Sequence, residues 1–116
     1  GGDLGGILEV IAAGASELQP WALSTTAWSL ARLRLRHAPL LATIADASTP
    51  RIRAGDFRAQ YLAKMAWACS KLSAADGDLL EAIADAATLN LGEATSAELA
   101  NLFWAFAKLV VSREPF

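Results

Sequence analysis

The sequence contains few of the residues on which most enzymes, metal sites and disulfide-stabilised proteins depend. Cys69 is the only cysteine and His37 the only histidine among 116 residues. A single cysteine cannot form an internal disulfide, which favours a reducing compartment or no redox role. No glycine-rich phosphate loop, metal-ligand cluster or nucleophile motif occurs in the sequence. We therefore expect a chain without catalysis, small-molecule substrate, metal or cofactor.

Long hydrophobic runs are also missing, although 54% of the residues are hydrophobic. The longest apolar stretch, residues 99–111, is interrupted by Asn101 and Lys108 and is too short to span a bilayer. We expect no transmembrane segment. The sequence has no initiator methionine and no basic, apolar leader, so we expect a processed protein or a segment of a longer one.

The sequence does contain a repeated pattern. In residues 23–33, 62–72 and 99–109, a leucine is followed by a tryptophan five positions later, then a basic residue four further, then a leucine. The tryptophans, at 28, 67 and 104, lie 39 and 37 residues apart, which indicates a repeat period. A second pattern, residues 40–47, recurs at 79–86 and more weakly at 7–13. The two patterns alternate and are rich in alanine and leucine, which predicts an all-α superhelix (solenoid) of helical hairpins with about six helices.

Capping residues, prolines and glycines set the expected helix boundaries. They predict helices at 7–14, 20–35, 40–48, from 57 or 58 to 72, from 78 to 89 or 91, and at about 96–111, within repeats at 1–17, 18–56, 57–94 and 95–116. Pro50 should end the third helix and leave residues 51–58 as a basic connector. The expected N-terminal caps are Ser16-Glu-Leu-Gln19, Asp56, Asp78 with Glu81, and Thr95-Ser-Ala-Glu98. Cys69 lies on a predicted core stripe and should behave as a small hydrophobic residue.

The segment Leu99-Ala-Asn-Leu-Phe-Trp104-Ala-Phe-Ala-Lys108-Leu109, with this repeat period, resembles octotricopeptide repeats. The resemblance covers most of the chain, from Ile7 to Leu109. Gln19-Pro20-Trp21 corresponds to the proline-containing helix start of that family, and the two later copies lack it. Such repeats are paired helices stacked into solenoids that bind organellar RNA. The resemblance therefore implies an RNA-binding module of a mitochondrion or chloroplast.

Charge is unevenly distributed around a net value of −2. Eight of the ten basic residues lie between Arg32 and Lys71, where Asp46 and Asp56 are the only acids. When the three Trp-containing helices are aligned on their first leucine, the residues two, six and nine positions later share one helical face. Neighbouring helices would join these small, polar or basic residues into a ladder. The ladder consists of Thr25, Ser29, Arg32, Lys64, Ala68, Lys71, Asn101, Ala105 and Lys108.

The resemblance assigns this ladder to RNA. It implies that Thr25, Lys64 and Asn101 face bases, while cations contact phosphates. The phosphate contacts would be Arg32, Lys71 and Lys108, reinforced by Arg34, Arg36, Arg51, Arg53 and Arg58. A ligand-free interpretation remains open, because the helix macrodipole favours a cation in the last turn of any helix. The tryptophans are interpreted as packing units between repeats.

A second function stays open beside RNA binding. The last predicted helix has no following repeat to cover an apolar edge made of Phe103, Phe106, Val110 and Val111. This edge and the basic patch could dock onto protein subunits of a larger organellar assembly. The acidic ends of the chain and the few phosphate contacts that two repeats provide argue against RNA. The sequence leaves RNA and protein partners as alternatives.

Overall fold

The computed structural model describes residues 4–72, 77–90 and 92–113, with side chains from residue 5 to residue 108 within these ranges. Its α-helices are α1 (Leu4–Gly14), α2 (Pro20–Arg32), α3 (Ala38–Arg53), α4 (Ala59–Leu72), α5 (Gly77–Leu89) and α6 (Ser96–Arg113), and a short 3-10 turn, η1 (Ala15–Glu17), follows α1. The described residues contain no strand, so the all-α prediction is confirmed. None of these helices is both long and apolar enough to cross a membrane.

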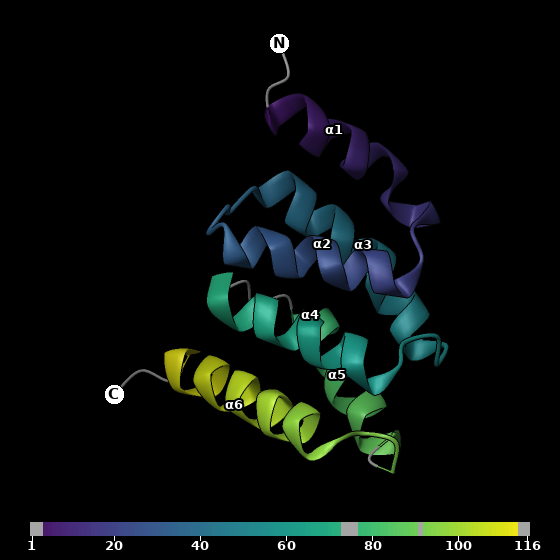
Figure 1. Ribbon diagram of the computed structural model, residues 1–116, viewed down its shortest axis with the longest axis vertical. Coiled ribbons are helices and arrows are strands. Elements are labelled where there is room, and N and C mark those ends of the chain that lie inside the picture. Colours follow the sequence, from purple (N-terminus) through teal and green to yellow (C-terminus); the bar gives the residue numbers. More distant parts are fainter. Residues whose placement is uncertain (1–3, 73–76, 91, 114–116) are drawn as a thin grey trace.

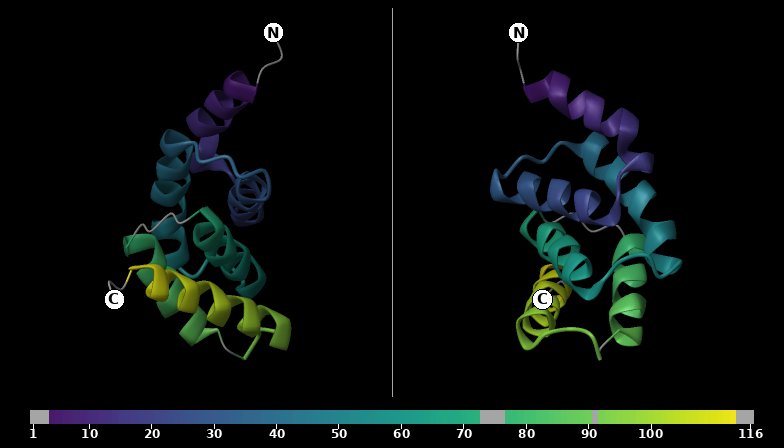
Figure 2. Two further views of the ribbon diagram at one scale, coloured as in Figure 1. Left: turned by 90° about the vertical axis from the view of Figure 1, so that its left-hand side faces the viewer. Right: turned by 45° about the vertical axis from the view of Figure 1, so that its right-hand side comes forward.

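The helices form two layers. Helices α2, α4 and α6, which carry the Trp-containing pattern, lie side by side with α4 in the middle (Figure 1). Helices α1, α3 and α5 form the second layer, in which α3 contacts both others. Helix α2 also packs against α3, and α4 against α5. The right-hand view of Figure 2 shows α4 and α6 in one layer and α5 in the other. The two sequence patterns therefore correspond to two different layers of the fold.

A single hydrophobic core lies between the layers. The four helices from α2 to α5 each contribute a fully buried side chain: Leu23 from α2, Ile44 from α3, Leu62 from α4 and Ile83 from α5. Cys69 is also buried, as its place on the core stripe predicted. Since the apolar face of each helix is covered mainly by other helices, the stack supplies most of the hydrophobic stabilisation.

Helix α2 ends earlier than predicted. It stops at Arg32, and the chain turns through Arg34, whose φ of 57° lies in the left-handed region. Leu33, which follows the last residue of α2, is 65% exposed at the C-terminal cap. The turn is closed by a hydrogen bond from the Leu35 amide to the Leu30 carbonyl, which satisfies a carbonyl that the helix end leaves unpaired.

The prediction that Pro50 ends the third helix is wrong. Helix α3 continues through Pro50 to Arg53, and the Ala54 amide donates to the Pro50 carbonyl at 3.0 Å. A proline inside a helix costs about 3 kcal/mol, because it lacks an N–H and clashes with the preceding turn. Burial of Ile52, which is 1% exposed, offsets most of that cost, since a buried isoleucine contributes about 1.5–3 kcal/mol. The connector therefore covers residues 54–58 and not 51–58.

Of the predicted N-terminal caps, the one at Thr95 is confirmed. The Thr95 amide donates to Glu98 Oε1 at 2.9 Å, and the Glu98 amide donates to Thr95 Oγ1 at 3.1 Å. The Ser16 cap is wrong, because Ser16 lies inside η1 and α2 begins after Gln19 without a side-chain cap.

The two other predicted caps are displaced. The cap at Asp56 is wrong, since α4 begins at Ala59, whose amide donates to Glu93 Oε1 at 3.0 Å. This carboxylate comes from a residue 34 positions later in the chain. Asp78 lies within the first turn of α5, which begins at Gly77, and so does not precede the helix as predicted. A helix start can thus be capped from a distant element that no local pattern indicates.

Candidate nucleic-acid interface

The Trp-containing layer carries a tryptophan with a cation over its ring on every helix. The basic residue four positions after each tryptophan lies one helical turn further on the same face. The cation-to-centroid distance is 5.0 Å for Arg32 over Trp28, 5.6 Å for Lys71 over Trp67 and 5.1 Å for Lys108 over Trp104. Each pair lies within the roughly 6 Å range of a cation–π interaction.

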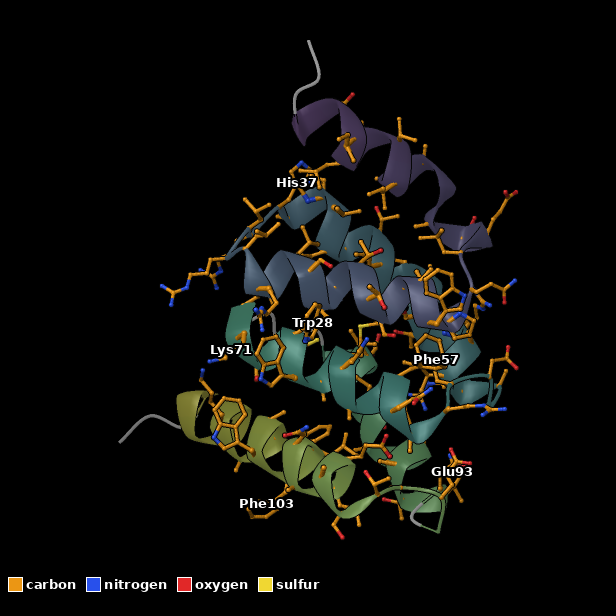
Figure 3. The ribbon with its side chains drawn as sticks, in the orientation of Figure 1. Trp28, His37, Phe57, Lys71, Glu93 and Phe103 are labelled. Atoms are coloured by element: carbon orange, nitrogen blue, oxygen red, sulfur yellow. The ribbon has the colours of Figure 1, made fainter. Side chains whose placement is uncertain are left out.

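Contacts between neighbouring helices join these pairs into one surface. Lys64 of α4 lies 5.5 Å from the ring centroid of Trp28 on α2, and Lys71 of α4 lies 5.4 Å from that of Trp104 on α6. The rings of Trp28 and Trp67 are 6.3 Å apart, tilted by 37°. Figure 3 shows Trp28 between α2 and α4, and Lys71 at the C-terminal end of α4. We call this surface the Trp–cation face; it consists of Trp28, Arg32, Lys64, Trp67, Lys71, Trp104 and Lys108.

Only some residues of the ladder predicted from the sequence lie on the exposed surface of the structure. In α4 and α6, the residue six positions after the first leucine of the pattern is buried: Ala68 is 1% and Ala105 0% exposed. The tryptophans take their place, and Trp104 is 45% exposed. The contact between Trp28 and Trp67 agrees with their interpretation as packing units between repeats. Their exposure was missed, although the Trp-to-cation spacing of four in each copy was a signal for it.

A basic groove opens at one end of the Trp–cation face. It has a volume of about 580 Å³, and Trp67 forms part of its wall. Five cations line it: Arg32, Arg34, Arg36, Lys71 and Lys108. Among the residues that the structure describes, no acidic side chain lines this groove. Arg36 is held in place there, because its Nε and Nη2 donate to the Leu72 carbonyl at the end of α4, at 2.9 and 2.6 Å.

A second hollow, the polar groove, adjoins the basic groove at Trp67. Its volume is about 290 Å³, and it lies across α2, α4 and α6. Two aromatic rings, two amides and two opposite charges line it, together with Ala63: Trp28, Trp67, Gln60, Asn101, Lys64 and Glu98. Lys64 and Asn101, two predicted base-facing residues, therefore meet in one place. Thr25, the third, is partly exposed on α2 and does not line either groove.

Three predicted phosphate contacts lie elsewhere. Arg51 and Arg53 belong to α3, in the other layer, because that helix continues past Pro50. Arg51 donates from Nη1 to the Leu18 carbonyl, and Arg53 Nη1 lies 3.7 Å from Asp85 Oδ2 on α5. Arg58 precedes α4 and lines a small hollow with Glu93 and Glu98. The structure thus brings together Arg32, Arg36, Lys71 and Lys108 but not these three.

The predicted apolar edge on α6 is only partly exposed. Phe103 is 77% exposed and points away from α4 (Figure 3), whereas Phe106 packs against the core. The side chains of Val110 and Val111 lie outside the described residues.

The two residues most often used in catalysis have structural contacts here. His37 precedes α3, and its Nδ1 accepts a hydrogen bond from the Leu40 amide at 3.1 Å, as a helix cap does. Cys69 is buried in the core. No group of three or more His, Cys, Asp or Glu side chains placed to hold a metal occurs in the part of the chain that the structure describes.

Comparisons with protein-family models, with curated proteins and with solved structures give no match for this chain.

Proposed function

We propose that this chain binds single-stranded RNA along the Trp–cation face, with phosphates in the basic groove. The observation that carries the proposal is the convergence of five cations and Trp67 on one groove, whose described lining residues include no acid. Proteins that bind single-stranded nucleic acids combine such a positive groove with aromatic side chains on which bases stack. The resemblance to octotricopeptide repeats supports the same ligand and extends it to organellar RNA.

The helix macrodipoles account for only part of this positive charge. Helices α2 and α4 end beside the groove, at Arg32 and Leu72. Each C-terminus carries the equivalent of about −0.5 elementary charge, so the two together offset about one of the five positive charges. The remaining excess attracts an anion with several charges, such as consecutive phosphates.

The exposed ring of Trp104 and the partly exposed ring of Trp28 favour single-stranded over double-stranded RNA. In a duplex the bases are stacked on each other, so their faces are not accessible to Trp28 or Trp104. A cation–π contact at an exposed site contributes about 0.5–1 kcal/mol, whereas stacking of a base on an aromatic side chain contributes about 1–3 kcal/mol. A base can therefore displace Lys64 from the ring of Trp28, and the displaced ammonium is then available to RNA.

Fluorescence anisotropy with a labelled single-stranded RNA tests this proposal. The double variant Arg32→Ala/Lys71→Ala should bind at least about tenfold more weakly at about 50 mM salt, because it loses two phosphate contacts. The slope of log K against log salt should fall in magnitude by about 1.4, or 0.7 for each lost contact on a single strand.

The matched control is Arg53→Ala/Arg58→Ala, which removes the same charge from two exposed residues outside both grooves. Its affinity should stay within about twofold of the unmodified chain, because it keeps the groove contacts. Equal losses in both double variants would refute the assignment to this groove, and absence of RNA binding at low salt would refute the function itself.

Docking to a protein subunit is the second candidate, favoured by the exposure of Phe103, which is 77%. Contiguous exposed apolar patches are typical of interaction sites, and Leu99, one helical turn before Phe103, is also exposed. A hydrophobic dye should bind the isolated chain, and Phe103→Ser should reduce that binding. A monomeric chain that binds no dye would remove the basis for this candidate.

A further inference from the structure

We infer that the polar groove is the base-recognition site of this RNA-binding surface, that it selects a base with an exocyclic amino group, and that guanine fits it best. This inference rests on the proposed function. It assigns specificity to Glu98 and Gln60, which lie beside Asn101 and Lys64 in the groove.

The size and walls of the polar groove suit one nucleobase. Its volume of about 290 Å³ lies at the lower end of small-molecule sites, which begin at about 300 Å³. Trp28 of α2 and Trp67 of α4 line the groove and supply its aromatic surface. Trp67 lines both grooves, so the polar groove adjoins the basic groove there. A base bound in the polar groove therefore places its phosphate toward the cations of the basic groove.

The polar side chains of the groove favour a base that both donates and accepts. An ionised carboxylate only accepts hydrogen bonds, and Glu98 uses Oε1 for the Thr95 amide at 2.9 Å. A carboxylate has about four acceptor positions, so Glu98 can accept further donors from a ligand. The Watson–Crick edge of guanine offers two adjacent donors, N1–H and the N2 amino group, and one acceptor, O6. Lys64 and the amides of Gln60 and Asn101 are donors for that acceptor.

Uracil fits the same groove less well. It presents two carbonyl oxygens and a single N–H on its Watson–Crick edge, and each oxygen placed near Glu98 would face a negative charge. Amino-bearing bases avoid this repulsion, and guanine alone gives the carboxylate two neighbouring donors. The basic groove makes no such distinction, because phosphates are identical in all nucleotides.

The test compares three labelled RNA oligomers that differ at one central position, which holds guanosine, inosine or uridine within a uridine strand. Inosine keeps O6 and N1–H of guanine but lacks the N2 amino group. The guanosine oligomer should bind roughly tenfold more tightly than the uridine oligomer, with inosine between them. Glu98→Gln should reduce the guanosine preference to below about threefold.

The choice of glutamine separates recognition from folding. Glutamine is accepted at the same position of a capping box, so the bond to the Thr95 amide can persist. Removal of the negative charge should leave binding of the all-uridine oligomer unchanged or tighter, a result that a folding defect would not give. Glu81→Gln, an exposed carboxylate on α5 in the other layer, should keep the guanosine preference.

The outcomes distinguish the two proposals. Salt-dependent binding that is equal for guanosine, inosine and uridine would overturn the base-recognition site and leave the proposed function standing. The same conclusion would follow if Glu98→Gln and Glu81→Gln gave equal preferences. Absence of binding to all three oligomers at low salt would overturn the proposed function and this inference with it.

Discussion

The tryptophans that occupy the same position of the repeat are predicted to contribute unequally to stability. Trp67 lies on the middle helix of its layer, packs against the hydrophobic core and contacts the ring of Trp28. Trp104 lies on α6 at the end of the layer, where it is 45% exposed and contacts two lysine ammonium groups. We therefore expect Trp67→Ala to lower the free energy of unfolding more than Trp104→Ala does.

The difference follows from burial and from ring contact. Packing of Trp67 against the core contributes on the order of 3 kcal/mol, and the pair with Trp28 adds about 0.5–1.5 kcal/mol. The buried part of Trp104 is smaller, and its exposed cation–π contacts contribute only about 0.5–1 kcal/mol each. Residual compaction of the unfolded chain reduces both burial values. We expect about 3–4 kcal/mol for Trp67→Ala, about 2 kcal/mol for Trp104→Ala, and a difference of at least about 1 kcal/mol.

Urea unfolding followed by circular dichroism measures this difference. With a slope of about 2 kcal/mol per molar urea, the midpoints of the two variants should differ by about 0.5 M or more. Trp21→Ala serves as the control, because Trp21 is 57% exposed, and it should cost no more than Trp104→Ala does, about 2 kcal/mol or less. Equal midpoints for Trp67→Ala and Trp104→Ala would refute the idea that position in the stack decides what each tryptophan contributes.

Three further predictions concern single side chains. Ser48→Ala should raise the free energy of unfolding by about 1 kcal/mol, because the buried Ser48 hydroxyl finds no hydrogen-bond partner among the described residues. Arg34→Gly should stabilise the fold by at most about 1 kcal/mol by relieving the positive φ of 57°, yet weaken RNA binding by removing a groove cation. Thr95→Ala should cost about 1 kcal/mol through loss of the α6 cap, and Thr95→Ser should restore most of it. Chemical denaturation measures the free energy of unfolding of these variants. A change of the opposite sign in any of them would contradict the contact assigned to that residue.

Features that depend on contacts within one helix could be predicted from the sequence. The helical character follows from alanine and leucine at helical spacing, and the Thr95–Glu98 cap joins residues only three positions apart. The pairing of each tryptophan with the cation four positions later also follows from the pitch of the helix. Cys69 was placed in the core because it lies on an apolar stripe, and it is buried there.

Features that depend on how helices meet needed the tertiary structure, because packing offsets between helices are not encoded in local spacing. Pro50 by itself predicts a helix end. Helix α3 continues past it because Ile52 is then buried in the core, and this packing overrides the local preference. Lys71 lies over the ring of Trp104 on another helix. Arg36 and Glu93 each bond a backbone group more than 30 residues away. The side chains that form the basic groove converge only through such contacts between helices.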